Sequence, residues 1–276
     1  MAKGDNRTMV EDSGSTRRMG HVSDEEGELS YGSYLRVPEL LSLQSPLSKP
    51  AAHDELLFIV VHQAFELWFR EILFELEAVR DLMFGGDANR ARHLLARVHA
   101  VERLLIEQLE VIETMSPQDF LEFRSNLSPA SGFQSVQFRE IEFLSGLKES
   151  GFLNMAQGEE GDRLRRRFDE ATLWEAFRAL MESNGLPMPA DDEDARRASL
   201  LKMARDRDAF AELWYLSEDL LVYDELFSLW RQRHILMVER QIGTKRGTGG
   251  SSGAPYLRTT LDKRFFPELW ELRSYL

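Results

Sequence analysis

Two of the six histidines, His62 and His234, lie in the middle of long apolar patterns with helical spacing. At about 100° per residue, large apolar side chains fall within roughly 60° of His62 and roughly 40° of His234. A buried imidazole has two polar nitrogens, which destabilise the fold unless a partner satisfies them. Each ring is therefore either a core histidine hydrogen-bonded to a carbonyl or carboxylate, or a residue that binds a ligand. The two patterns alone leave both interpretations open.

If these histidines bind a ligand, its class is restricted by the rest of the sequence. The chain has no cysteine, and two core imidazoles favour a flat apolar cofactor with an axial site, for which haem is the best candidate. One histidine would bind the iron and the other would line the opposite face. His93 and His99 point well away from the apolar stripe of their helix, so we expect both to be solvated. Di-metal carboxylate chemistry is disfavoured, because neither Glu-x-x-His nor His-Glu-x-x-His occurs.

Two other features could bind a small polar molecule. Phe120 and Arg124 stand at positions i and i+4 of a short predicted helix, and a guanidinium is suited to a carboxylate. A surface salt bridge is the alternative for Arg124. The glycine-rich stretch 243–253, GTKRGTGGSSG, fits neither the phosphate-binding loop nor the dinucleotide-binding pattern and follows a predicted helix. It is either a flexible surface loop or a lid that closes over a small ligand.

Composition excludes several classes of protein. The chain has 276 residues, 43% hydrophobic residues and a net charge of −13. This charge argues against nucleic acid or an anionic membrane surface as the main partner. No apolar run approaches the ~20 residues needed to span a bilayer, and the first residues lack the hydrophobic segment of a secretory signal. Without cysteine, disulfides and thiolate metal sites are also excluded. We expect a cytoplasmic protein.

The organisation of the chain follows from its breaks and periodicities. Residues 1–28 form a predicted mobile polar tail, and 29–276 a single all-helical domain. Within it, 29–52 is an arm that could reach a neighbouring subunit, and 150–200 is a peripheral helical insertion. Helices are predicted over 54–84, 87–114, 117–124 (with a Ser116–Asp119 capping box), 133–146, 173–183 and 201–242, with a break near 205–208 and a short closing helix at Pro267.

No stretch alternates like a strand for a useful length, and no internal repeat is present. The predicted fold class is therefore all-α, built on long antiparallel helices that form a bundle around the two histidines.

Several long motifs, taken in order and spacing, resemble the tryptophan 2,3-dioxygenase family. They are YGSYLRVPELLSLQSPLS, HDELLFIVVHQAFELWFREI, FLEFRSNLSPASGFQSVQFREIEFL, LWRQRH and IGTKRGTGGSSG. The resemblance runs from about residue 30 to the end of the sequence and is weakest between 150 and 200. It implies an all-α fold of the tryptophan/indoleamine dioxygenase type, a b-type haem that is active as Fe(II), and a homotetramer.

The resemblance also implies a reaction. Both atoms of O₂ are inserted across the indole C2–C3 bond of L-tryptophan to give N-formyl-L-kynurenine, the first step of tryptophan degradation by the kynurenine pathway. Alternatives are a related haem oxygenase acting on another indole, a haem-based gas sensor, and a haem-free helical interaction protein. A gas sensor would have no reason to combine Arg124 with Thr248, which together favour an amino acid as substrate.

By motif position, the resemblance gives each site residue an expected role. His234 corresponds to the proximal iron ligand, and His62 to the distal histidine that hydrogen-bonds the indole N–H; we favour positioning over proton removal for His62. On the substrate side, Phe58 would belong to the wall around the indole, Phe120 would lie beneath the ring, and Arg124 would clamp the carboxylate. Thr248 would contact the ammonium and carboxylate as the loop closes, and Ser131 and Gly132 would lie against the haem on the substrate side. The arm that completes a neighbouring subunit's pocket would carry Tyr31, Tyr34 and Leu35.

Overall fold

A computed structural model describes residues 29–250 and 252–276, and all regular secondary structure in these residues is helical. The predicted all-α class is confirmed. Among the same residues, no helix is both long and apolar enough to cross a membrane. The predicted polar tail, residues 1–28, lies outside the described residues.

The chain divides into two compact units, of which the first is Met1–Leu43. Its described part contains two short helices, α1 (Tyr31–Leu35) and α2 (Val37–Leu41). Ser30 and Ser33 form a capping box at the start of α1, and Arg36 separates the helices in a left-handed conformation with φ of 51°. No side chain of either helix is buried.

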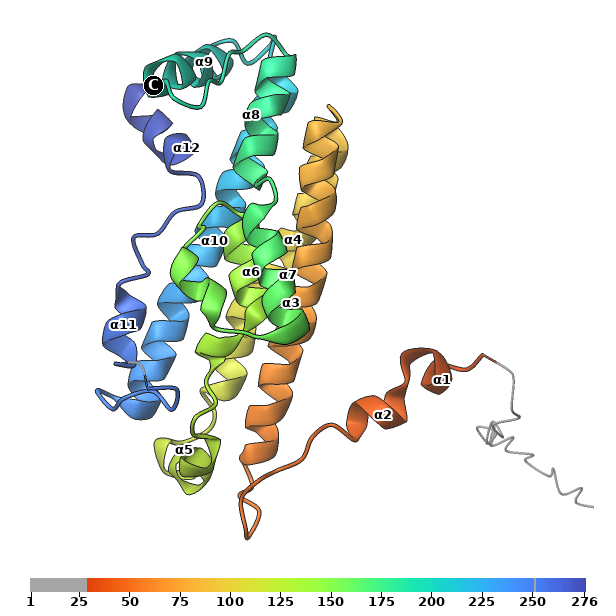
Figure 1. The fold of residues 1–276 in the computed structure, drawn as a ribbon, viewed down its shortest axis with the longest axis vertical. Coiled ribbons are helices and arrows are strands. Elements are labelled where there is room, and N and C mark those ends of the chain that lie inside the picture. Colours follow the sequence, from red (N-terminus) through yellow and green to blue (C-terminus); the bar gives the residue numbers. More distant parts are fainter. Residues whose placement is uncertain (1–28, 251) are drawn as a thin grey trace, which may run out of the picture. The chain divides into compact units, whose positions relative to one another are not determined.

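The second unit, Gln44–Leu276, is organised around three long helices, α3 (Glu55–Phe84), α4 (Ala88–Ile112) and α10 (Ala211–Ile242). Figure 1 shows them as the central rods of this unit. Helix α4 packs against both of the others. Helices α4 and α10 run in the same direction. Near their first residues Asn89 contacts Glu212, and near their last residues Gln241 contacts Met115. Helix α3 is antiparallel to α4, because Val61 lies beside Gln108 and Glu75 beside Arg97.

Several helices begin or end at the capping residues and breaks that the sequence predicts. Helix α3 ends at Phe84 with Gly85 as its C-cap, and the next residue, Gly86, has φ of +83°, which glycine adopts without strain. The predicted capping box of α5 (Pro117–Arg124) is present, with Ser116 and Asp119 satisfying each other's backbone N–H groups. The predicted interruption near residues 205–208 is also confirmed, because α9 (Glu193–Arg205) ends there and α10 begins at Ala211.

Shorter elements complete the unit. They are the 3₁₀ turns Ser125–Leu127, Gly132–Gln134, Ser150–Asn154 and Arg273–Tyr275, and the helices α6 (Val136–Leu144), α7 (Gly158–Asp169), α8 (Leu173–Ser183), α11 (Ala254–Arg258) and α12 (Pro267–Leu272). Thr172 caps α8 as predicted. From the 150–200 segment, Leu173, Phe177 and Met181 are fully buried and belong to the same hydrophobic core as α3, α4 and α10.

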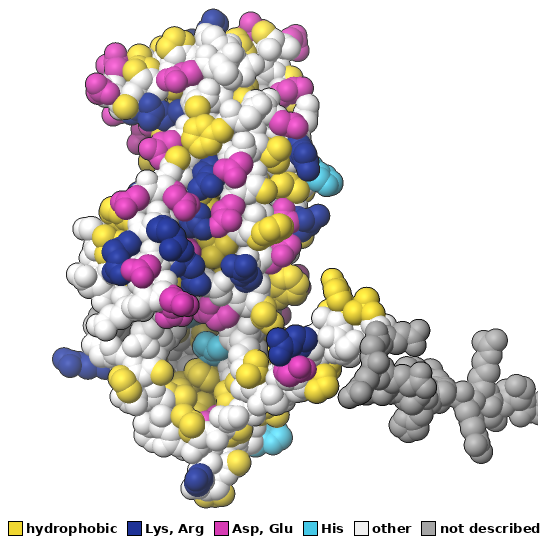
Figure 2. All heavy atoms as spheres, turned by 45° about the vertical axis from the view of Figure 1, so that its right-hand side comes forward, with side chains coloured by type: hydrophobic (Ala, Val, Ile, Leu, Met, Phe, Trp, Pro, Cys, Tyr) yellow, Lys and Arg dark blue, Asp and Glu magenta, His cyan; other side chains and the backbone are white. Residues whose placement is uncertain are grey.

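Charged side chains of both signs are interspersed over the visible surface of the second unit, as Figure 2 shows. Many of them are paired: Arg80 and Arg167 both reach Glu170, and Arg163 pairs with Glu140. These pairs hold α7, and Glu170 directly after it, against α3 and α6.

The prediction that His99 is solvated is wrong, whereas His93 is exposed as expected. His99 is only 6% exposed, and its Nε2 lies 2.9 Å from the backbone carbonyl oxygen of Asp219 on α10. Helix α4 is enclosed by α3 on one side and α10 on the other, so side chains outside its main apolar stripe are also buried. Burial lowers the pKa of His99, and the bond to Asp219 partly opposes this effect.

The buried His99 predicts a specific acid sensitivity. Because the pKa of His99 is lower in the folded protein than its ordinary value of 6.5, the unfolded state binds more protons below that pH, and stability falls as the pH falls. We expect His99→Gln to flatten this decline between pH 6.5 and 5 in denaturant titrations. His93→Gln is the matched control on the same helix and should leave the decline unchanged. An equal decline in wild type and His99→Gln would contradict the assignment.

Candidate active site

A cavity of about 600 Å³ lies at the end of the second unit that contains the start of α3 and the end of α10. Its wall comes from α3, α4, α5, the 3₁₀ turn Gly132–Gln134, α6, α10, the glycine-rich stretch 243–253 and α11. Figure 2 shows a hollow in the same unit, with a histidine side chain inside it and apolar side chains below. Eight of the residues predicted for the site line this one cavity: Phe58, His62, Phe120, Arg124, Ser131, Gly132, His234 and Thr248.

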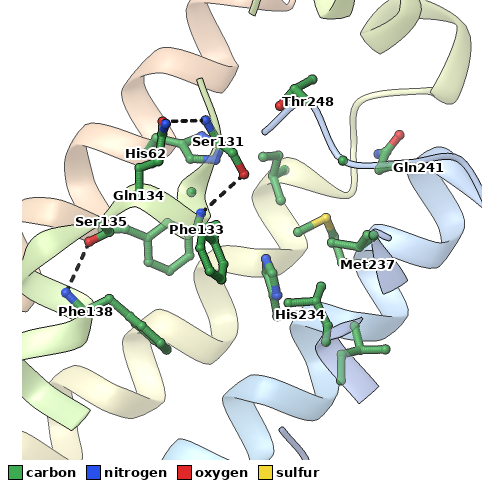
Figure 3. A pocket seen from close by; sticks show the side chains of 18 of the residues that line it. His62, Ser131, Phe133, Gln134, Ser135, Phe138, His234, Met237, Gln241 and Thr248 are labelled. Atoms are coloured by element: carbon green, nitrogen blue, oxygen red, sulfur yellow. Dashed lines mark hydrogen bonds between the residues drawn. The ribbon is translucent and has the colours of Figure 1, made fainter. Parts of the chain in front are cut away.

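His62 enters the cavity from α3, in the first third of that helix (Figure 3). Its Nδ1 lies 2.7 Å from the carbonyl oxygen of Phe58, one turn earlier. Since a carbonyl can only accept, Nδ1 carries the proton and donates it. Burial lowers the pKa of His62, although the bond to Phe58 and the charge of Glu66 oppose the effect. The ring is therefore neutral at pH 7, and Nε2 presents a free lone pair.

His234 enters the cavity from α10 (Figure 3). Burial, with a smaller contribution from His62, lowers the pKa of His234 to about 4, so this ring is also neutral at pH 7. Trp230, one turn earlier, stacks on it with ring centroids 5.0 Å apart and an interplanar angle of 8°. Neither ring nitrogen has a hydrogen-bond partner among the described residues. The interpretation as a core histidine bonded to a carbonyl or carboxylate therefore fails for His234.

An aromatic cluster forms one wall beside His62. Phe58 lies against the imidazole, with centroids 4.0 Å apart, and stacks on Phe120 at 5.7 Å. Phe123, from the same helix as Phe120, packs edge-on against both rings and is fully buried. These contacts leave an apolar slot beside the His62 imidazole. Such a slot is suited to a flat aromatic ring that carries one N–H.

Arg124 and Thr248 bring the glycine-rich loop against the segment after α5. The guanidinium of Arg124 donates to the carbonyl of Arg246, and the hydroxyl of Thr248 donates to the carbonyl of Ala130 over 2.6 Å. Gly249 approaches Ser131 so closely that an added Cβ would lie 2.6 Å from the Ser131 Cβ. The loop therefore lies against the 128–131 segment, and a residue with a side chain at position 249 would prevent this seating.

Ser131 and Gly132 form the bend between α5 and α6. The Ser131 hydroxyl accepts from the backbone N–H of Phe133 over 3.3 Å, and the Ser131 N–H donates to the side chain of Gln134 over 3.1 Å (Figure 3). A Cβ on Gly132 would meet no atom within 4 Å, so the cavity is open at this residue.

Three charged residues in the cavity wall were not identified from the sequence. Arg139, Glu142 and Arg231 are each at most 7% exposed. Glu142 pairs with both arginines, using Oε2 for Arg139 and Oε1 for Arg231, the latter over 2.8 Å. Glu142 and Asp224 both act on Arg231, so Arg139, whose Nε has no acceptor among the described residues, is the buried cation best able to bind an added anion. The sequence feature that could have indicated this buried group is the position of Arg139 and Glu142 between apolar residues in the FREIEF motif.

The residues of this cavity fit a haem. The cavity is lined by many aromatic side chains, His234 offers a neutral imidazole without a partner among the described residues, and the arginines of the wall suit the carboxylates of a porphyrin. Two buried donors in the wall, Arg139 Nε and Trp230 Nε1, also lack an acceptor among the described residues. Buried donors are rarely left unpaired, so an absent acceptor is the simplest explanation.

Tyr31, Tyr34 and Leu35 belong to the N-terminal unit described above. Their side chains are 78%, 72% and 44% exposed. Large apolar and aromatic side chains at such exposure, next to one another on one short helix, are available to a partner.

Comparison with known proteins identifies the family. The family profile of tryptophan 2,3-dioxygenase matches residues 15–192 and 191–276. Proteins named tryptophan 2,3-dioxygenase from Nocardioides sp., Herpetosiphon aurantiacus and Caulobacter vibrioides are 53%, 43% and 40% identical to this chain. These alignments cover 92%, 90% and 90% of the chain and 97%, 98% and 99% of the respective relatives. The chain belongs to the tryptophan 2,3-dioxygenase family.

Proposed function

We propose that this protein is a haem-dependent dioxygenase that inserts both atoms of O₂ across the indole C2–C3 bond of L-tryptophan, giving N-formyl-L-kynurenine. The observation that carries the proposal is the meeting of two neutral imidazoles, an arginine and a threonine-bearing glycine loop in one apolar cavity. The reaction adds O₂ without any other oxidant or reductant. It would be the first step of the kynurenine pathway, and we expect it in the cytoplasm.

His234 would hold the haem through its iron, and the Arg139–Glu142–Arg231 group would compensate the porphyrin carboxylates. Bound b-type haem in the Fe(II) state supplies the O₂-activating chemistry. Ser131 and Gly132 would lie on the substrate side, where the open space beside Gly132 admits a close approach. The protein's own contribution is to keep the site apolar and to exclude water from it.

His62 would orient the indole. Its Nδ1–H is engaged by the carbonyl of Phe58, so its Nε2 can only accept. An indole N–H is a donor and meets that lone pair, while Phe58 and Phe120 hold the ring plane. The bond to Phe58 also keeps the imidazole from rotating. Because burial lowers the pKa of His62, this ring is a weak base, which supports a positioning role over removal of the indole proton.

Arg124 and Thr248 would bind the amino-acid end of the substrate. Both already contact backbone carbonyls, those of Arg246 and Ala130. A substrate carboxylate would replace the first carbonyl as a charged acceptor for the guanidinium, and such charge-assisted bonds are stronger than neutral ones. The pair thereby selects an amino acid over a bare indole.

We also propose that the active form is a homotetramer in which the arm carrying Tyr31, Tyr34 and Leu35 completes a neighbouring pocket. Exposed apolar residues on each of the three long helices support self-association. At about 100° per residue, six of them point about 140–160° away from a cavity-lining residue of the same helix, His62 on α3, Leu109 on α4 or His234 on α10. They are Val60 and Leu67 on α3, Leu104 and Val111 on α4, and Leu229 and Leu236 on α10, each at least 39% exposed.

Turnover of tryptophan by the ferrous, haem-loaded protein in air tests the proposed function. We expect an absorbance increase from N-formylkynurenine. Arg124→Gln should raise KM for tryptophan by about 10- to 150-fold, because about 1.5–3 kcal/mol is typical for a hydrogen bond to a charged group. The same variant should turn over a methylindole, if wild type does, without a comparable change.

Arg165→Gln is the matched control, since Arg165 lies on the surface of α7 and pairs with Asp162. Its KM should equal that of the wild type. A stable oxygenated spectrum with no product would instead indicate a gas sensor, and absence of a Soret band after expression with haem supplied would indicate a haem-free protein. Oxidation of other indoles but not of tryptophan would show that the protein is a haem oxygenase with a different indole substrate.

The contact between Gly249 and Ser131 predicts how the loop is seated. Gly249→Ala introduces a Cβ 2.6 Å from that of Ser131, so the loop should lift and trypsin should cut faster after Lys245 and Arg246. Gly151→Ala is the control, because a Cβ there meets nothing within 4 Å. Adding Ser131→Gly to Gly249→Ala removes the colliding atom and should slow the cleavage again. Equal cleavage rates in all four proteins would contradict this seating.

The exposed apolar residues of α3 and α4 predict what a charge introduced at a subunit contact would do. We expect the wild type to have about four times the chain mass of 31.9 kDa in light scattering after gel filtration. Leu67→Glu and Leu104→Glu should each shift the protein to smaller species, because a carboxylate is costly to desolvate at an interface. Leu276→Glu, at the exposed C-terminus, should not. A tetramer that survives both substitutions would place the contact elsewhere.

A further inference from the structure

Three buried carboxylate oxygens near the middle of the second unit have no hydrogen-bond donor among the described residues. They are both oxygens of Glu102, on α4, and Oδ1 of Asp224, on α10. Glu102 is 2% exposed and Asp224 is 1% exposed. Carboxylate oxygens left without a donor in a core are strongly destabilising, so these three atoms require an explanation.

Glu102 and Asp224 lie at the same level of two helices that run in the same direction. Before this level along the two helices, His99 contacts the backbone of Asp219. After it, Glu113 contacts Arg240. Glu102, three residues after His99, therefore falls opposite the turn of α10 that holds Asp224. Consistent with this, the charge of Asp224 is the strongest charge effect on the Glu102 carboxyl.

The second oxygen of Asp224 fastens the C-terminal segment. Oδ2 accepts from the backbone N–H groups of Phe265 and Phe266 over 3.0 and 3.2 Å, and from the indole N–H of Trp270 over 2.8 Å. All three groups donate, so Oδ2 acts only as an acceptor. Arg231 adds a bond from α10 to the carbonyl of Lys263, and the preceding helix α11 lines the cavity.

The surroundings of Glu102 contain little positive charge to balance a second carboxylate. Tyr223, from α10, is buried and hydrogen-bonds Ser145, which follows α6. Arg231, the cation acting on Asp224 and Tyr223, is held by Glu142 of α6. Arg103, on α4 itself, acts on Glu102 more weakly than Asp224 does. Burial first, and then the Asp224 charge, raises the pKa of Glu102 well above its ordinary value of 4.5.

We infer that Glu102 and Asp224 share one proton at neutral pH, carried by Glu102 and donated to Oδ1 of Asp224. The shared proton satisfies two of the three unpaired oxygens, and it lets Asp224 hold residues 265–270 without a second charge beside it. It makes the attachment of the C-terminal segment sensitive to alkali. In the folded state Glu102 keeps its proton above pH 4.5, whereas in the unfolded state it loses it. Stability therefore falls as the pH rises toward the raised pKa.

Glu102→Gln tests the shared proton, because the amide has the same shape and still donates to Asp224 but cannot titrate. Native-state hydrogen exchange at the amides of Phe265 and Phe266, in the haem-loaded protein, measures the opening of this attachment. Opening of the attachment exposes Glu102 and Asp224 to water, and Glu102 then loses its proton. We therefore expect the opening equilibrium constant of the wild type to rise about tenfold per pH unit relative to that of Glu102→Gln, because one proton is released on opening. The same slope in both proteins would overturn the inference.

Glu75→Gln is the matched control, since Glu75 is equally buried but paired with Arg97; it should lower stability without changing the relative slope. A measurement on the wild type avoids reliance on any variant. Infrared spectroscopy at neutral pH should show the carbonyl stretch of a buried protonated carboxylic acid, which disappears as the pH is raised. Absence of that band at neutral pH would overturn the inference even if Glu102→Gln failed to fold.

Discussion

The structure depends on keeping two neutral imidazoles in one apolar cavity. Bringing a histidine into a core disfavours its charged form, and His234 has a pKa of about 4 for this reason. His62 compensates by bonding to the carbonyl of Phe58, but His234 has stacking by Trp230 and no hydrogen bond among the described residues. Burying a polar ring without a hydrogen-bond partner destabilises the fold. The arrangement is explained if a metal binds the free nitrogen, because metal ligation requires a neutral ring.

The rest of the second unit holds these two rings in place. Helices α3 and α10 are both anchored on α4, so the positions of His62 and His234 are set by the packing of three long helices rather than by loops. The polar groups that must grip a substrate come from shorter and more adjustable pieces, α5 and the glycine-rich loop. This division suits a site whose cofactor pocket is rigid and whose substrate side must open and close.

Helical periodicity was sufficient to predict most of the elements and the two central histidines, because a 3.6-residue period identifies the face that turns inward. Capping residues such as Ser116 and Thr172 located helix starts for the same local reason. His99 was mispredicted because one period reports one buried face, whereas α4 is enclosed on two. The shared direction of α4 and α10 follows from tertiary packing between residues more than 100 positions apart, which no local pattern specifies. The importance of Glu142 was missed because a charge in an amphipathic helix normally faces water. The roles of the site residues came from the family resemblance, not from periodicity.

The central claim is that His234, and not His62, is the residue whose free nitrogen binds iron. Resonance Raman spectroscopy of the ferrous, haem-loaded protein without O₂ tests it directly through the iron–imidazole stretching band. The band should be present in the wild type and in His62→Phe, and it should be lost in His234→Gly and restored there by added imidazole. A band that persists in His234→Gly before imidazole is added, or that is lost only in His62→Phe, would contradict the account.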